Sequence, residues 1–212
     1  MIDPDILRVV AITDNIRDGQ AGLTARALAA ISGGATCVQL RLKDVQPRDL
    51  IEIAREMVRV LPVPLIVNDR ADVAIAAGAS GVHLGADDVP AVTIRTIVPQ
   101  QFIIGVSVGS DDEIAGASGA DYVGIGPLFA TVSKDDAGNP IGTAEFARLA
   151  ARIGLPAVAI GGISAANARL AMDAGACGIA SIAAIFGISD PAAGATALRS
   201  ATETSHPARA SH

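Results

Sequence analysis

The chain has few aromatic residues and an excess of acidic over basic ones. Its 212 residues include no Trp, one Tyr and four Phe, and the formal net charge at pH 7 is −6. Proteins that bind nucleic acids cluster Lys and Arg against the phosphates and often stack bases on aromatic rings. Because both features are scarce here, we expect no nucleic-acid partner.

The sequence is also poor in cysteine and has no long apolar run. Cys37 and Cys177 lie in separate apolar stretches, without a CxxC motif or a nearby His. This setting predicts reduced core thiols rather than a disulfide, metal or redox site. No uninterrupted apolar segment could span a bilayer, and the start, MIDPDILRVV, lacks the basic region of a secretory signal. We therefore expect a cytoplasmic protein with no membrane partner.

Hydrophobic residues make up 50% of the chain and charged residues only 18%, which is sufficient for a large core. Short apolar runs of strand length occur at residues 8–13, 36–41, 64–67, 80–84, 102–106, 121–125, 156–160 and 177–182. Segments with helical spacing alternate with them, at residues 24–32, 48–60, 69–77, 90–97, 111–117, 143–153 and 164–174. This strict alternation predicts an α/β fold with a parallel sheet and right-handed crossovers.

A repeated dipeptide separates a closed barrel from an open sheet. Gly-Ala precedes the second, fourth, sixth and eighth predicted strands, at residues 34–35, 78–79, 119–120 and 175–176. The even strands therefore begin with the same backbone geometry. This suits a (β/α)₈ TIM barrel, in which alternate strands fill alternate layers, better than an open sheet whose strand order reverses at one point. We predict one barrel over residues 1–188. Residues 189–212 would add a helix at about 190–200 and a flexible tail to the same domain.

Polar residues follow the ends of several predicted strands, where TIM barrels build their active sites. In the stretch VQLRLKD, the alternation of a strand places Gln39, Arg41 and Lys43 on one face. Two buried cations are costly unless they border a wet, anion-filled cavity, which would be the mouth of the barrel. The alternative is that Arg41 and Lys43 pair with Asp44 or with neighbouring acids at the rim.

Acidic residues follow the third and fourth predicted strands. Asn68 and Asp69 end the third, and Asp87 and Asp88 follow the fourth. Neighbouring parallel strands are roughly 4.8 Å apart, so Asp69 and Asp88 could share one Mg²⁺ together with substrate phosphates. Asn68 or Asp69 could instead cap the next helix, and Asp87 could replace Asp88 as the ligand.

The last three strands precede features typical of phosphate binding. Residues 124–142 form an unusually long connection with hydroxyl groups and a cation, which predicts a lid. The loops after the seventh and eighth strands form the phosphate site of many TIM barrels. The candidate residues are Thr131, Ser133 and Lys134 in the long connection, Gly161 and Gly162 after the seventh strand, and Ile182 and Ala183 after the eighth.

Seven motifs between about residues 8 and 187 resemble the thiamine-phosphate synthase family. In order they are VQLRLKD, IVNDRAD, GVHLGADD, IGVSV, YVGIGPLFATVSKDD, VAIGGIS and IASIAAIF. The resemblance implies a Mg²⁺-dependent (β/α)₈ transferase. Its small-molecule substrates would be 4-amino-2-methyl-5-hydroxymethylpyrimidine diphosphate and 4-methyl-5-(2-phosphooxyethyl)thiazole or its carboxylated form. Its products would be thiamine phosphate and pyrophosphate, and a homo-oligomer is compatible with this function.

The resemblance also implies roles for individual residues. Those that would hold the pyrimidine diphosphate are Gln39, Arg41, Lys43 and Asn68, with Ser107 on the pyrimidine amine, Lys134 on the diphosphate, and Asp69 and Asp88 on Mg²⁺. Those that would hold the thiazole phosphate are Thr131, Ser133, Gly162, Ile182 and Ala183, next to Gly161. Arg41, Lys43, Ser107 and Lys134 would take part in catalysis. His83 lies inside a strand, and we interpret it as a packed structural residue.

The chain departs from the family pattern at Ala86, Val108 and Ala183, where Gln, Thr and Ser are usual. Three alternatives therefore stay open. A thiazole tautomerase-like relative tends to lose the Asn-Asp pair and the basic strand residues, which this chain keeps. A pentose-phosphate epimerase needs several metal-binding histidines at strand ends, whereas His83 is the one histidine in a predicted strand of this chain. A non-catalytic phosphate-binding barrel would need neither Lys134 nor two acids at neighbouring strand ends.

Overall fold

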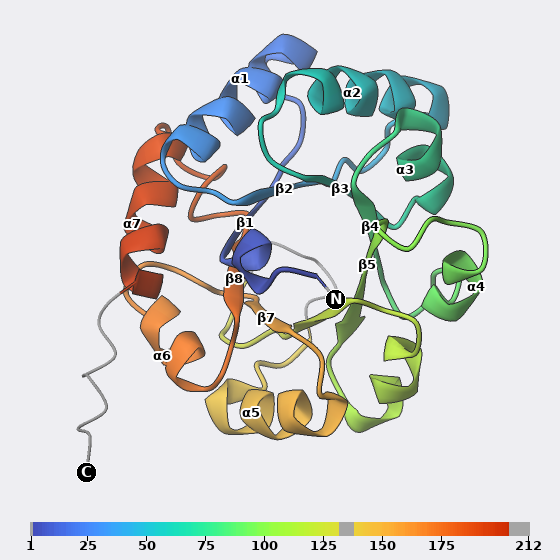
Figure 1. Ribbon diagram of the computed structural model, residues 1–212. Coiled ribbons are helices and arrows are strands. Elements are labelled where there is room, and N and C mark those ends of the chain that lie inside the picture. The colour runs from blue at the N-terminus through green and yellow to red at the C-terminus, as the bar shows by residue number, and fades with distance from the viewer. Residues whose placement is uncertain (1, 132–137, 204–212) are drawn as a thin grey trace.

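The computed structural model describes residues 2–131 and 138–203, and its eight parallel strands close into a barrel in the order of the sequence. The strands are β1 (Val9–Ile12), β2 (Cys37–Leu40), β3 (Leu65–Asn68), β4 (Gly81–Leu84), β5 (Ile103–Val108), β6 (Tyr122–Ile125), β7 (Ala157–Ile160) and β8 (Gly178–Ser181). Pairing of Val10 with Ala180 joins β1 to β8 and closes the ring. Seen along the barrel axis, helices α1 to α7 form an outer layer around the strands (Figure 1). The predicted (β/α)₈ barrel is confirmed.

Helical segments precede, connect and follow the strands. They are η1 (Pro4–Leu7), α1 (Gly19–Ser32), α2 (Pro47–Val60), α3 (Ala71–Ala77), α4 (Ala91–Arg95), η2 (Asp111–Ala117), α5 (Gly142–Ile153), α6 (Ala168–Asp173) and α7 (Pro191–Glu203), where η marks 3₁₀ helices. Among the described residues, no helix has both the length and the apolar character needed to cross a membrane.

The helices differ from the predictions mainly at their ends. The predicted helix at 69–77 begins only at Ala71, because Asp69 has a φ of 65°, outside the right-handed helical region. The predicted helix at 164–174 begins at Ala168, after a turn in which Asn167 Oδ1 accepts a hydrogen bond from the Ser164 N–H. At the C-terminus, α7 continues to Glu203, and the predicted tail beyond it lies outside the described residues.

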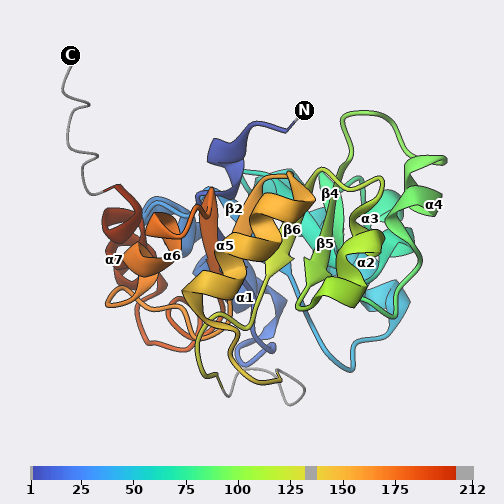
Figure 2. The same ribbon diagram turned by 90° about the horizontal axis from the view of Figure 1, so that it is seen from below.

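The core has two parts, one between the strands and the helices and one inside the barrel. Strand alternation decides the part to which a residue belongs, since Val38 and Leu40 of β2 face the helices while Cys37 faces the barrel interior. Leu7, at the end of η1, is fully buried in the interior cluster. The N-terminal segment thus closes one end of the barrel, and residues 126–131, which follow β6, lie at the other end (Figure 2).

Both cysteines are free thiols that pack with the interior cluster. Burial raises the pKa of Cys37 to about 12 and that of Cys177 to about 11. Since the reactive form of cysteine is the thiolate, these protonated side chains act as packing groups at neutral pH.

The Gly-Ala dipeptides give the even strands a common entry, as predicted. The four glycines have φ values of 107°, 71°, 85° and 97°, at Gly34, Gly78, Gly119 and Gly175. After each of them the next N–H bonds back into the preceding helical segment, as in the 2.9 Å bond from Ala79 N to Ala74 O. Left-handed glycines therefore end these helices and turn the chain into the next strand.

Candidate active site

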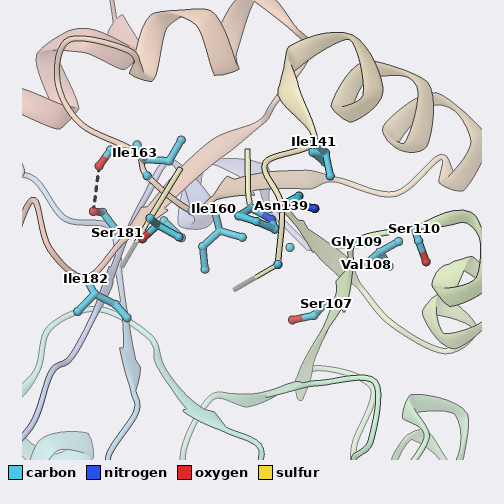
Figure 3. Close-up of a pocket in the computed structure, with 18 of the residues that line it drawn as sticks. Ser107, Val108, Gly109, Ser110, Asn139, Ile141, Ile160, Ile163, Ser181 and Ile182 are labelled. Carbon is cyan, nitrogen blue, oxygen red and sulfur yellow. Dashed lines mark hydrogen bonds between the residues drawn. The ribbon is translucent and has the colours of Figure 1, made fainter. Parts of the chain in front are cut away.

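A cavity of about 440 Å³ opens at the carboxyl ends of β5 to β8, a volume that suits a small-molecule site. Ser107 lies on one side of it, and Ile163, Ser181 and Ile182 lie on the other (Figure 3). The predicted site residues among its lining are Ser107, Thr131, Gly161, Gly162, Ile182 and Ala183. The structure thus brings together six candidates from four strand ends.

The turn after β7 requires its two glycines. Gly161 and Gly162 have φ values of 90° and 65°, which side chains rarely adopt. A Cβ on Gly161 would lie 2.5 Å from Pro127 Cα, and one on Gly162 would lie 2.5 Å from Ala130 O. The close partner is thus the chain that follows β6. Backbone conformation and packing therefore already require glycine at both positions, apart from any role in binding a ligand.

Two polar side chains fix the loops after β7 and β8. Asn167 Nδ2 donates a 2.9 Å hydrogen bond to the Gly162 carbonyl. Ser181 Oγ donates to the Ile163 carbonyl and accepts from the Ala184 N–H, both at 3.2 Å. These bonds couple the two loops, so their backbone groups hold a defined orientation beside the cavity.

Several backbone donors of these loops have no hydrogen-bond partner in the part of the chain that the structure describes. Within residues 2–131 and 138–203, the N–H groups of Gly162, Ile163 and Ala183 donate to no backbone or side-chain acceptor. All three residues line the cavity. Because unpaired N–H groups beside a solvent-filled cavity are ready to bind an anion, this end of the cavity has the chemistry of a phosphate site.

A second group of candidates lies on β2 and β3, across the barrel. Gln39 is buried, and its Nε2 donates a 2.6 Å hydrogen bond to Asn68 Oδ1. The Arg41 backbone is held by Thr13, whose Oγ1 accepts from the Arg41 N–H at 2.9 Å and donates to its carbonyl at 3.0 Å. Among the described residues, the Arg41 guanidinium forms no ion pair or hydrogen bond. An ion pair with an acid at the barrel rim therefore does not explain why an arginine occupies this position. Lys43 is exposed.

Asp69 holds a backbone conformation that is rare for residues other than glycine. Its φ is 65°, and its N–H donates a 2.8 Å hydrogen bond to the His83 carbonyl on β4. The N-cap residue of helix α3 is Arg70, which makes no side-chain capping bond, so the cap position belongs to neither Asn68 nor Asp69. Such strain at a strand end is a common feature of functional sites.

Asp88 and Asp87 differ in their surroundings. Asp88 is half-buried, its Oδ2 accepts a 2.7 Å hydrogen bond from the Gly85 N–H, and it lines a second cavity of about 250 Å³. Ser107 lines both cavities, whereas Asp87 is exposed and lines neither. Within the described residues, no group of three or more His, Cys, Asp or Glu side chains could hold a metal ion.

Several residues of the site were not predicted from the sequence. Glu113 and Asn139 line the large cavity, and Glu113 Oε2 accepts a 2.6 Å hydrogen bond from the Gly109 N–H. Glu113 lies in an acidic run at the start of a helical segment, which is also typical of a solvated helix end, so no sequence signal marked it. The predicted residues Ser133 and Lys134 lie outside the described residues.

Comparisons with known proteins identify the family. The family model described as thiamine monophosphate synthase matches residues 9–185. Thiamine-phosphate synthase from Methanoculleus marisnigri is 51% identical over 181 residues, 83% of this chain and 86% of that protein. The enzyme of the same name from Roseiflexus sp. (strain RS-1) is 46% identical over 195 residues, 90% of this chain and 83% of its own.

A solved structure shows the same similarity in three dimensions. Thiamine phosphate pyrophosphorylase from Pyrococcus furiosus aligns with a TM-score of 0.82 and 35% identity, over 94% of this chain and 97% of that one. The matches span nearly the whole barrel and therefore include every strand end that carries a candidate residue. The chain belongs to the thiamine monophosphate synthase family.

Proposed function

We propose that this protein is a Mg²⁺-dependent thiamine-phosphate synthase that joins the pyrimidine diphosphate to the thiazole phosphate, in thiamine biosynthesis. One observation carries the proposal beyond family membership, namely the two-sided mouth of the barrel. Arg41, Asp69 and Asp88 follow β2 to β4. On the opposite side, after β7 and β8, lie backbone donors that have no partner among the described residues. Two phosphorylated substrates can thus approach each other across the barrel axis.

The β2 and β3 side is suited to the pyrimidine diphosphate. The hydrogen bond from Gln39 Nε2 to Asn68 Oδ1 leaves Gln39 Oε1 and Asn68 Nδ2 without partners among the described residues. Gln39 Oε1 can therefore accept from the pyrimidine amine, and Asn68 Nδ2 can donate to the diphosphate. Arg41 and Lys43, with Lys134 from the long loop, add the positive charge that a diphosphate requires.

The acids fit a Mg²⁺ ion. Mg²⁺ prefers oxygen ligands and is usually held by one or two carboxylates together with substrate phosphates, so a group of three acids is not needed. Asp69 is exposed on a backbone fixed to β4, and the Asp88 carboxylate is oriented by the Gly85 N–H. We assign these two residues as the ligands. The bound ion would supply charge neutralisation at the diphosphate.

The loops after β7 and β8 are suited to the thiazole phosphate. The N–H groups of Gly162, Ile163 and Ala183 are available there, and Thr131 and Ser133 would add hydroxyl groups. Ala183 lacks the hydroxyl that the family pattern usually has at this position. Since its backbone N–H supplies a donor, the site keeps its main interaction with an anion.

The reaction needs charge neutralisation and positioning more than proton transfer. When the diphosphate leaves, the pyrimidine-methylene carbon becomes electron-poor and the leaving group gains charge. Arg41, Lys43 and Lys134 stabilise that charge. The loops after β7 (161–163) and β8 (182–183), together called the phosphate loop, aim the thiazole nitrogen at the carbon. Because the attacking nitrogen carries no proton, no general base is required. A tautomerase-like or purely binding function would leave Arg41, Asn68 and Asp69 without a role.

Comparing two neighbouring acids tests the metal assignment. We expect Asp88→Asn to raise the Mg²⁺ concentration for half-maximal activity about tenfold or more. Even substitutions of residues that only contact a metal ligand lower metal affinity or activity about 10–100-fold. Asp87→Asn is the matched control and should leave the Mg²⁺ titration unchanged. A shift with Asp87→Asn alone would make Asp87 the ligand and contradict the assignment.

A further inference from the structure

Three polar side chains form a chain of hydrogen bonds inside the barrel, below the proposed pyrimidine site. The Tyr122 hydroxyl on β6 lies 3.0 Å from His83 Nδ1 on β4, and His83 Nε2 lies 3.0 Å from Ser107 Oγ on β5. Tyr122 and His83 are 2% and 8% exposed, whereas Ser107 is half-buried and lines both cavities. The chain therefore runs from the closed interior to the open site.

Two interior glycines make room for the rings. A Cβ on Gly105 would lie 2.2 Å from Tyr122 Cζ, and one on Gly124 would lie 3.0 Å from His83 Cε1. The two rings pack at a centroid distance of 5.5 Å. Their positions are therefore set by the local sequence of β5 and β6, as expected for an arrangement in which orientation matters.

Burial fixes the direction of these hydrogen bonds. Desolvation raises the pKa of the Tyr122 phenol well above its ordinary value, so the phenol keeps its proton. Among the described residues, its one hydrogen-bond partner is His83 Nδ1, and a buried O–H without an acceptor is costly. The phenol therefore donates to Nδ1, and the histidine carries its proton on Nε2. That N–H donates to Ser107 Oγ.

We propose that His83 and Tyr122 are positioning residues that fix the Ser107 hydroxyl as a hydrogen-bond donor toward the substrate. With one lone pair of Ser107 Oγ held by His83, the O–H and the second lone pair face the site. This pair matches the adjacent ring nitrogen and amine of a 4-aminopyrimidine, so the donor bond goes to the ring nitrogen. The inference rests on the proposed function, in which Ser107 faces the pyrimidine.

Substitutions that act through Ser107 test the proposal. We expect Ser107→Ala and His83→Leu each to weaken Mg²⁺-dependent binding of the pyrimidine diphosphate about tenfold, and Tyr122→Phe about fivefold. In the Ser107→Ala background, His83→Leu and Tyr122→Phe should not weaken binding of the pyrimidine diphosphate any further. His83→Gln is the matched variant, because its amide can still donate to Ser107, and it should stay within about threefold of the parent. Calorimetry measures binding, and thermal unfolding checks the fold.

Two further readouts separate positioning from general disruption. The KM for the thiazole phosphate should be the same in all folded variants. An analogue with C–H in place of the ring nitrogen beside the amine should bind the parent and the Tyr122→Phe variant equally well. If the His83→Leu variant does not fold, the comparison of Tyr122→Phe with His83→Gln still tests the proposal.

The outcomes separate the positioning role of His83 and Tyr122 from the proposed function. Additive losses in the Ser107→Ala background, or an equal rise of the thiazole phosphate KM, would overturn the positioning role and leave the proposed function in place. If Ser107→Ala binds the pyrimidine diphosphate like the parent, Ser107 does not face the pyrimidine. That result would remove this contact from the proposed function and the inference with it.

Discussion

Replacing Asp69 with asparagine is expected to lower kcat about 1,000-fold while leaving the fold intact. The loss follows because a bound metal ion would supply several kcal/mol of charge stabilisation, which is lost with the carboxylate that holds it, and each 1.4 kcal/mol or so changes the rate tenfold. Asparagine keeps the shape of the side chain and tolerates the φ of 65° at this position. The measurement is kcat at saturating substrates over a range of Mg²⁺ concentrations, with thermal unfolding of the same samples.

Asp44 provides the matched control for this variant. It has a φ of 60°, is exposed, and lies in the neighbouring loop after β2. Asp44→Asn therefore repeats the chemical change in the same backbone conformation, without a metal role, and should change kcat less than about twofold. An Asp69→Asn protein that matched the parent at every Mg²⁺ concentration would remove Asp69 from the mechanism.

Gly162→Ala is expected to raise the KM for the thiazole phosphate about 100-fold. The added Cβ would lie 2.5 Å from Ala130 O and 2.8 Å from Phe129 Cβ, so the turn must move and take its N–H donors with it. Charge-assisted hydrogen bonds contribute about 1.5–3 kcal/mol each, and losing one or two accounts for the change. Binding of the pyrimidine diphosphate, across the barrel, should stay within about twofold.

Gly154→Ala separates the effect on the site from backbone strain. Gly154 ends α5 with a φ of 71°, and a Cβ there would meet nothing within 4 Å. Alanine should lower the free energy of unfolding by about 1 kcal/mol through the left-handed conformation, with no change in either KM. If Gly162→Ala showed only this pattern, the phosphate loop would not be where the thiazole phosphate binds.

The barrel was predictable because its signals are local. Each strand is a short apolar run bounded by Gly, Pro or polar residues, and buried parallel strands show this pattern clearly. The Gly-Ala pairs were informative for the same reason, since a left-handed helix end depends on the residue at that position. Element η1 was missed because it has four residues and no helical period. Residues 111–117 were predicted helical but form a 3₁₀ helix, a distinction the hydrophobic period does not make.

The candidate site was predictable only in part. Arg41, Asp69 and Gly162 could be located because TIM barrels place functional residues at the carboxyl ends of strands. The contact between His83 and Tyr122 could not be found this way, since β4 and β6 are not neighbours and their side chains meet only when the sheet closes. Asn167, in the turn before α6, donates a hydrogen bond to the Gly162 carbonyl, and no pattern in the sequence predicts that bond.

The most direct test of the account is a reaction with both substrates. Purified protein is mixed with Mg²⁺, the pyrimidine diphosphate and the thiazole phosphate, thiamine phosphate is followed by mass, and pyrophosphate is followed by a coupled assay. The account predicts that both products form in equal amounts and that EDTA abolishes the reaction. If neither product forms while the thiazole phosphate still binds, the protein is not a synthase, and its phosphate loop serves another reaction.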